Sequence, residues 1–199
     1  MKNIIIIGTG RVGKTTLSNM VKEQFPTCNL IHSDSIKWGI IRGQGKEKYY
    51  DENVKAQKEW EHGEEFQKIL LEIIKSMIRN DTKHYGTILE TGQLEPKYAK
   101  ELVDMGNTYC ICLGHGDLTK QDIIDLCRTH DKETDWSYGI SDNDLDAHAN
   151  KWDEANQNLK KDCTKYGIEY IDTHENREEI LKQILEKIKK ECIEEEKSI

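Results

Sequence analysis

The chain of 199 residues is long enough for one domain with a full hydrophobic core and too short for two such domains. Its formal net charge is -8 and its pI is near 5.4, and a surface of that charge repels phosphates, which argues against nucleic-acid partners. No stretch has the length of a membrane-spanning helix and no secretory leader is recognisable, so we expect a cytoplasmic protein with reduced cysteines and no membrane partner.

The first element is a strand followed by a glycine-rich loop. Four isoleucines, Ile4 to Ile7, predict a buried strand, and Gly8 to Thr15 carry the phosphate-binding pattern G-x-x-x-x-G-K-T. Glycines let successive backbone N–H groups turn inward around phosphate oxygens at the N-terminus of the next helix. The pattern predicts a nucleoside triphosphate site made of Gly8, Thr9, Gly10, Arg11, Val12, Gly13, Lys14, Thr15 and Thr16.

Two side chains of this loop have specific chemistry. Lys14 can reach the β and γ phosphates as a mobile point charge, and we expect it to act in catalysis. The Thr15 hydroxyl is expected to bind Mg²⁺. The loop therefore predicts ATP as phosphate donor together with Mg²⁺.

The rest of the chain alternates between strand and helix patterns. Runs of strand length occur at residues 4–7, 28–32, 87–90, 108–113 and 167–172. Helical patterns separate them, at residues 17–25, 36–41, 54–78 (one helix, or a pair split near Gly63), from Pro96, 118–128, from Ser141, and 180–188. This order predicts an α/β fold: a P-loop NTPase three-layer sandwich whose five-stranded parallel sheet has helices on both faces.

Within a single domain of residues 1–199, two regions are set apart by composition. The helical region at about 35–80 is expected to bind the substrate. Residues 130–139 are polar with almost no apolar period, which favours a small lid at about 128–141. Cys110 and Cys112 alternate with apolar residues in a predicted strand, which favours packing over a metal site, since a closed zinc site needs four ligands.

Ligands of open parallel sheets lie beyond the carboxyl ends of the strands, and four such ends carry polar groups: Asp34, Glu90, residues 115–117 and residues 173–176. Asp34 is our candidate to accept the proton of a substrate hydroxyl; the alternative is the N-cap of a helix beginning at Ser35. Glu90 is our candidate to hold Mg²⁺ or its water and to face the substrate, and the alternative is an exposed acid.

Arginine matches the oxygens of a transferring phosphoryl group better than lysine does, because its guanidinium is a planar fork. Arg128 lies where a helix enters the expected lid and is our candidate to stabilise the transition state. Arg42 is our candidate to clamp an acidic substrate, and for both arginines the alternative is an ordinary surface position. Arg11 either reaches a phosphate or points to solvent.

Taken together, these residues resemble the nucleoside-monophosphate-kinase-like superfamily, which includes adenylate, shikimate and gluconate kinases, zeta-toxin kinases and 2-phosphoglycerate kinase. Beside Gly8 to Thr15, residues 31–37 and 88–96 are similar to the ends of strands two and three in the last two groups. The resemblance implies that Asp34 is the base, that Glu90 supports Mg²⁺ and that Arg128 is the lid arginine. Lys37 stands where those relatives have a substrate-binding arginine.

The expected activity is therefore an ATP-dependent phosphotransferase that moves the γ phosphate to a small metabolite. The expected partner is that small-molecule acceptor, and the protein is expected to be a monomer or homodimer. One alternative is a regulatory ATPase or switch GTPase with a conformational output, although the chain has no Asp-x-x-Gly sequence. A further alternative is a toxin-like kinase that acts on a nucleotide sugar.

Overall fold

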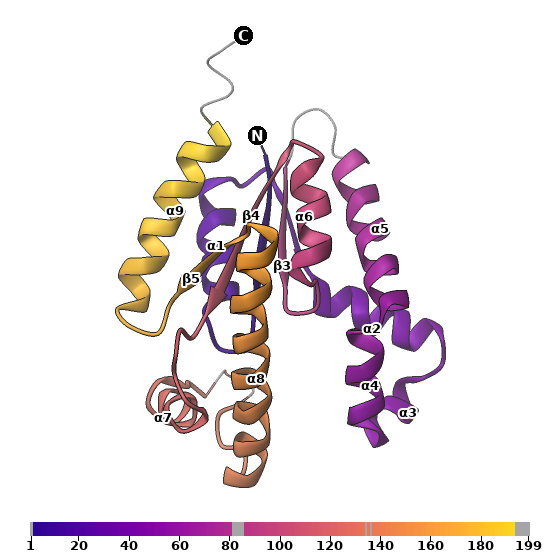
Figure 1. Ribbon diagram of the computed structural model, residues 1–199, viewed down its shortest axis with the longest axis vertical. Helices are drawn as coiled ribbons and strands as arrows, with labels where there is room; N and C mark the ends of the chain where they lie inside the picture. Colours follow the sequence, from indigo (N-terminus) through magenta and orange to yellow (C-terminus); the bar gives the residue numbers. More distant parts are fainter. Residues whose placement is uncertain (1, 81–85, 134, 136, 194–199) are drawn as a thin grey trace.

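A computed structural model of the protein describes residues 2–80, 86–133, 135 and 137–193. Its centre is a sheet of parallel strands in the order β2-β3-β1-β4-β5 (Figure 1). The strands are β1 (Asn3–Gly8), β2 (Asn29–His32), β3 (Thr87–Thr91), β4 (Thr108–Gly114) and β5 (Glu169–Asp172). The five apolar runs thus form the parallel sheet that the sequence predicts, and that prediction is confirmed.

Helices connect the strands and cover the sheet. They are α1 (Lys14–Gln24), α2 (Ser33–Gly43), α3 (Glu47–Glu52), α4 (Val54–Glu61), α5 (Glu64–Asn80), α6 (Pro96–Asp104), α7 (Lys120–His130), α8 (Asp142–Tyr166) and α9 (Arg177–Ile193). The break between α4 and α5 falls at the predicted position. Within the described ranges, no helix combines the length and the apolar character needed to cross a lipid bilayer.

The sheet lies between two layers of helices, and a hydrophobic core fills the space on each of its faces. Side chains alternate between the faces of a strand. Ile5 and Ile7 of β1 accordingly pack in a core with apolar residues of α5, α6 and α8, whereas Ile4 and Ile6 pack in a second core with residues of α1 and α9. All four isoleucines are at most 1% exposed, so β1 is fully covered on both faces. This burial fixes the strand from which the glycine-rich loop emerges.

Two helices differ from the sequence prediction. Helix α2 begins at Ser33, directly after β2, rather than near residue 36. Helix α3 was not predicted, because its six residues are polar apart from two tyrosines. One of them, Tyr50, is buried and stacks on Trp60 of α4 with ring centroids 5.6 Å apart. A tertiary contact of this kind stabilises a short helix that local sequence does not specify.

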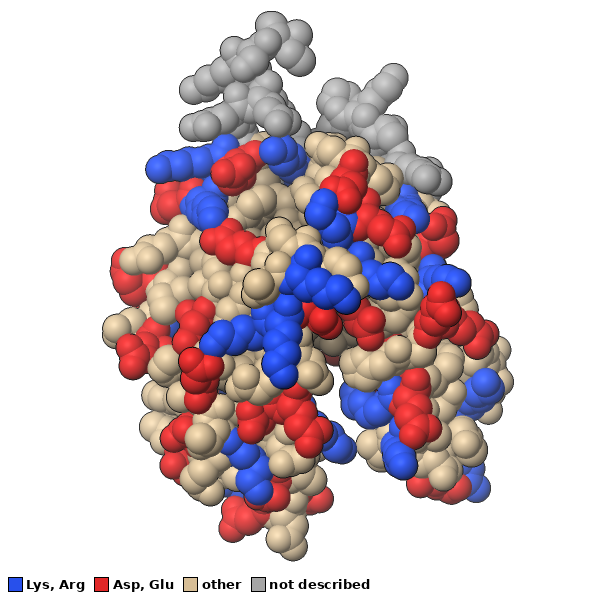
Figure 2. Space-filling model, in the orientation of Figure 1, with Lys and Arg blue, Asp and Glu red and all other residues tan. Residues whose placement is uncertain are grey.

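Beyond the carboxyl ends of the strands the protein divides into two lobes. One contains α7 and the first half of α8, and the other contains α2, α3 and α4 (Figure 1). The surface is deeply hollowed between them (Figure 2). The carboxyl ends of β1, β2 and β3 lie on this side of the sheet (Figure 1), which places the candidate residues of the sequence analysis at one edge of the sheet.

Candidate active site

The glycine-rich loop joins β1 to α1 at the carboxyl edge of the sheet. Gly13 has φ 91° and Arg11 has φ 64°, so the backbone twice adopts a left-handed conformation, which glycine tolerates well. Gly10 lies against α8, where a Cβ atom would be 2.3 Å from the indole of Trp152. The loop ends on the N-terminus of α1, where unpaired N–H groups and the helix dipole favour an anion.

Lys14, in the first turn of α1, spans this loop. Its Nζ donates a hydrogen bond to the carbonyl oxygen of Thr9 at 2.5 Å. Burial lowers the pKa of Lys14, and the carboxylates of Glu90 and Asp34 oppose that effect. The ammonium group is therefore electrostatically linked to both acids that the sequence singled out.

Glu90 contacts the loop from the neighbouring strand. Strands β1 and β3 pair directly, with Ile6 opposite Glu90. The Glu90 carboxylate accepts a hydrogen bond from Thr15 Oγ1 at 3.2 Å, and the same oxygen lies 2.5 Å from Nδ1 of His32. Only 14% of the Glu90 side chain is exposed, so the alternative of an exposed strand-end acid is wrong. A hydroxyl and a carboxylate side by side are the oxygen donors that Mg²⁺ prefers.

Asp34 lies in the first turn of α2, and His32 occupies the N-cap position without a capping hydrogen bond from its side chain. The alternative of Asp34 as the helix cap is therefore wrong. Its Oδ1 accepts a hydrogen bond from Gln93 Nε2 at 2.9 Å and forms an ion pair with Lys37 at 2.9 Å. Burial raises the pKa of Asp34, but Lys37 and Gln93 outweigh this effect and hold the pKa below its usual value. The side chain is still 68% exposed and thus open to a ligand.

Lys37 connects Asp34 to a second, buried acid. Its Nζ lies 3.4 Å from Oε1 of Glu61, at the end of α4, and only 9% of the Lys37 side chain and 2% of the Glu61 side chain are exposed. Glu61 also accepts hydrogen bonds from Gln57 at 2.9 Å and Lys58 at 2.8 Å. Sequence analysis missed Glu61, because its contact with Lys37 joins two helices and has no local sequence signal.

Arg11 joins the glycine-rich loop to the segment between α7 and α8. It forms ion pairs with Asp131 and Asp135, the latter at 3.2 Å. Burial lowers the pKa of Arg11, but the two carboxylates outweigh it and raise the pKa above the usual value. Of the expected lid, Thr134 and Trp136 lie outside the described residues.

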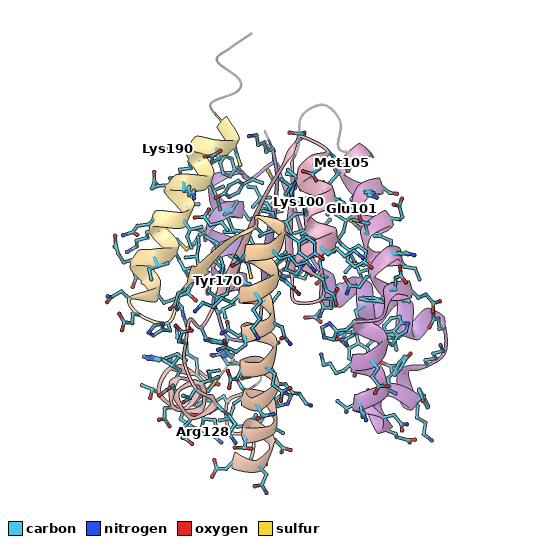
Figure 3. All side chains as sticks on the ribbon, viewed as in Figure 1. Lys100, Glu101, Met105, Arg128, Tyr170 and Lys190 are labelled. Carbon is cyan, nitrogen blue, oxygen red and sulfur yellow. The ribbon has the colours of Figure 1, made fainter. Side chains whose placement is uncertain are left out.

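The other two candidate arginines lie away from the loop. Arg128, near the end of α7, donates to the carbonyl oxygen of Ile140 at 2.9 Å and to Asp142 at 2.7 Å, at the base of the expected lid (Figure 3). Arg42, in the last turn of α2, pairs with Glu47 at 2.8 Å and is 63% exposed. The structure therefore brings Lys14, Thr15, Glu90 and Asp34 together, and places Arg128 and Arg42 in neighbouring segments.

The segment after β5 also supports the loop, through residues that the sequence analysis did not assign. The hydroxyl of Thr173 lies 2.8 Å from the carbonyl oxygen of Val12. Arg177, at the start of α9, lies beside Gly13, because a Cβ atom there would be 3.4 Å from the arginine Cδ. Burial lowers the pKa of Arg177, and the nearby charge of Arg11 lowers it further.

A hydrogen-bonded network holds the other side of the loop. The ring Nε2 of His115, directly after β4, lies 2.9 Å from the carbonyl oxygen of Gly10. Asn156 of α8 accepts from the backbone N–H of His115 at 2.9 Å and donates to the carbonyl oxygen of Gly116 at 2.9 Å. The hydroxyl of Tyr170, which lies between β5 and α8 in Figure 3, donates to Asn156 at 2.7 Å. These contacts fix the position of the loop relative to β4.

We predict that His115 makes stability depend on pH. Its side chain is buried, and burial lowers its pKa from 6.5 to about 4 although the bond to Gly10 opposes this. Between these pH values the unfolded chain binds a proton that the folded chain does not, so acidification lowers the free energy of unfolding by up to about 1.4 kcal/mol per pH unit. We expect urea unfolding to show that the free energy of unfolding falls more steeply between pH 6.5 and 4 for the wild type than for His115→Gln. If the free energies of the two proteins fall in parallel, His115 is not the group responsible.

Other sequence features carry no site. Cys110 and Cys112 are buried in β4, as expected for packing. No cluster of three or more metal-binding side chains occurs in the part of the chain that the structure describes. Residues 150–153 match the letters of the guanine-reading pattern Asn-Lys-x-Asp, but they lie in the interior of α8 and not after the carboxyl end of a strand, where parallel sheets bind their ligands.

Comparison with known proteins gives matches in structure only. No protein-family model and no curated protein sequence matches the chain. A shikimate kinase from Aquifex aeolicus matches with a TM-score of 0.52 and 15% identity over 96% of this chain and 98% of that one. A gluconokinase from Sinorhizobium meliloti 1021 matches with a TM-score of 0.59 and 13% identity over 96% of this chain and 93% of that one.

A shikimate kinase from Acinetobacter baumannii, in complex with shikimate, matches with a TM-score of 0.52 and 17% identity over 97% of this chain and 96% of that one. The chain shares the α/β fold of these three kinases. At these identities the likeness concerns the fold, and it confirms the fold class that the sequence predicts.

Proposed function

We propose that this protein is an ATP-dependent phosphotransferase that transfers the γ phosphate of ATP to a hydroxyl group of a small metabolite. The observation that carries the proposal is the position of Asp34, an exposed carboxylate that shares an electrostatic environment with Lys14 of the phosphate loop. A base next to a phosphate site is the arrangement that phosphoryl transfer to an alcohol requires. The shared fold with shikimate kinase and gluconokinase supports a small-molecule acceptor.

In this proposal Asp34 positions the acceptor hydroxyl and takes its proton. Its lowered pKa keeps it ionised at neutral pH, so it is always able to accept a hydrogen bond. A weak base suffices, because the transition state of phosphoryl transfer is loose and the proton leaves late. Gln93 and Lys37 hold the carboxylate in place from two sides.

Thr15 and Glu90 would hold Mg²⁺, since their oxygen atoms adjoin each other beside Lys14. When bound, Mg²⁺ neutralises the charge of the β and γ phosphates. Residues Gly8 to Thr16 bind the triphosphate, and Lys14 provides a positive charge to the transferring group. His32 keeps the Glu90 carboxylate oriented toward Thr15.

We further propose that residues 128–141 form a lid and that Arg128 reaches the transferring phosphoryl group when the lid closes. The pair between Arg128 and Asp142 is easily broken, since the Asp142 side chain is 98% exposed and exposed ion pairs contribute at most about 1 kcal/mol. Arg42 and Lys37 contribute to the acceptor site on the opposite lobe.

The lid proposal predicts that hydrogen exchange in residues 128–139 slows when ATP and an acceptor are both added. Arg128→Lys keeps the charge but loses the planar fork, so kcat should fall by at least about tenfold while the affinity for ATP changes little. Asp142→Asn is the control: it breaks the same ion pair without altering Arg128 and should leave kcat unchanged. If exchange is insensitive to ligands and Arg128→Lys is fully active, the arginine that stabilises the transition state is Arg11 or Arg42.

The test of the function is ADP formation measured with Mg·ATP and a library of nucleosides, nucleotides, nucleotide sugars, sugars and sugar acids. A kinase shows acceptor-dependent turnover, whereas a regulatory ATPase hydrolyses ATP at a rate that no acceptor increases. A kinase for nucleotide sugars would turn over only those members of the library. We propose that the protein acts in the cytoplasm, as a monomer or homodimer, on a small molecule and not on a nucleic acid or a membrane.

A further inference from the structure

The acceptor side of the hollow is rich in acids. Asp34 is 68% exposed beside Gln93, and Glu90 lies one strand away. Glu95, which follows β3 by a few residues, is 37% exposed and lies 3.5 Å from His62. A ligand that approaches Asp34 therefore meets its carboxylate first, since Gln93 is buried.

Lys37 is the cation that contacts Asp34, and its charge is already compensated. Its Nζ lies between Oδ1 of Asp34 and Oε1 of Glu61, at 2.9 and 3.4 Å, and its side chain is almost fully buried. An anionic ligand would have to compete with both carboxylates. Removing either contact would leave a buried charge with one partner fewer, which is costly.

The described arginines do not take the place of Lys37 as a cation for a ligand next to Asp34. Those whose side chains the structure describes have partners elsewhere: Arg11 with Asp131 and Asp135, Arg42 with Glu47, Arg128 with Asp142, and Arg177 with the carbonyl oxygen of Thr173. Arg42 in addition lies over the ring of Trp38, at 5.8 Å, and is mostly exposed. In the described structure no guanidinium is thus placed to form a fork with a carboxylate or phosphate next to Asp34.

We infer that the phosphate acceptor is an uncharged or positively charged polyhydroxy compound, and not a carboxylic acid or a phosphate ester. This inference rests on the proposed function and specifies its acceptor. Hydroxyl groups fit the site because the exposed carboxylate of Asp34 accepts their hydrogen bonds. A negative group is disfavoured, since like charges across a binding surface reduce affinity and exclude wrong partners.

Acceptors that share a carbon skeleton and differ in charge give the sharpest test on the unaltered protein. Gluconate, glucitol and glucamine share a six-carbon polyol chain and carry a negative charge, no charge and a positive charge. Adenosine and AMP form a second set, and glucuronate, glucose and glucosamine a third. We expect kcat/KM for the neutral or cationic member of an accepted set to exceed that of the anion by at least about tenfold. Equal or higher kcat/KM for the anion would overturn the inference.

Glu61→Gln tests whether the compensated charge of Lys37 causes the preference against anionic acceptors. The amide keeps the shape of the side chain but removes one of the two charges that compensate Lys37, so the preference against the anion should shrink. Glu59→Gln, on the same helix, is the matched control, because it removes only the exposed partner of Lys55, whose side chain is 92% exposed, and should leave the preference unchanged. If Glu61→Gln does not fold, the charge series on the wild type still decides.

The two levels of the proposal fail differently. If an anionic acceptor is preferred, phosphotransfer stands and the inference about charge is wrong. If Mg·ATP binds but no compound in the library or the charge series is phosphorylated, the proposed function fails, and the inference fails with it.

Discussion

Asp34→Asn is expected to lower kcat by about two to four orders of magnitude while the affinity for Mg·ATP stays within a few fold of the wild type. The amide keeps the size of the side chain and can still accept a hydrogen bond from Gln93. It cannot take a proton from the acceptor, and it no longer carries the charge that pairs with Lys37. Initial rates with saturating acceptor measure the change in kcat, and calorimetric titration of nucleotide measures the affinity for Mg·ATP separately.

The matched control for this variant is Asp51→Asn, which makes the same chemical change at an exposed position of α3. It should leave both kcat and affinity unchanged. Near wild-type turnover in Asp34→Asn would mean that Asp34 only anchors α2 through Lys37 and Gln93. The pH profile adds an independent check: because the pKa of Asp34 lies below 3.8, its protonation should not limit the rate between pH 5 and 7.

The sequence predicts the site residues that lie at or just after the carboxyl ends of the strands. Buried strands and turn residues are local signals, and a parallel sheet brings its carboxyl ends to one edge whatever the side chains are. Thr15, Glu90 and Asp34 could therefore be placed near each other from their positions alone. The contact between Thr15 and Glu90, 75 residues apart in sequence, follows from the direct pairing of β1 and β3.

The parts that were not predicted depend on how helices pack. Glu61 meets Lys37 because the end of α4 lies beside Lys37 of α2, and no local pattern specifies that approach. His115 was recognised as a strand-end residue, but its bond to Gly10 depends on Asn156, 41 residues further along the chain. Arg128 was chosen for its place at the edge of a polar segment, and its partner Asp142 is set by the course of that segment.

The hydrogen bonds around His115 help to explain how the glycine-rich loop keeps its backbone conformation. Arg11 and Gly13 hold left-handed conformations, which cost free energy at the arginine. The contacts with His115, Trp152 and Thr173 come from three different elements and fix the loop from the outside. Its inner side is thereby left to the ligand, as preorganised anion sites require.

Lys14→Ala is expected to reduce kcat/KM for ATP by at least about two orders of magnitude, because it removes a charge that acts on the phosphates in a largely desolvated position. Nucleotide should also stabilise the wild type more than the variant. At a concentration of 100 Kd, binding to the folded state alone adds about 2.7 kcal/mol, which corresponds to a rise in Tm of roughly 5–10 °C for a chain of this size. At the same nucleotide concentration, most of this rise should be lost in Lys14→Ala.

Lys48→Ala provides the matched control, since it removes a lysine whose side chain is 89% exposed on α3. It should leave the nucleotide-dependent rise in Tm and the turnover unchanged. Loss of transfer with retained binding in Lys14→Ala would assign the ammonium group to the transition state, and loss of both would assign it to the bound triphosphate as well. Unchanged affinity and turnover in Lys14→Ala would refute the assignment of Gly8 to Thr16 as the phosphate site. The reason is that Lys14 provides the positive charge of this loop that interacts with Glu90 and Asp34.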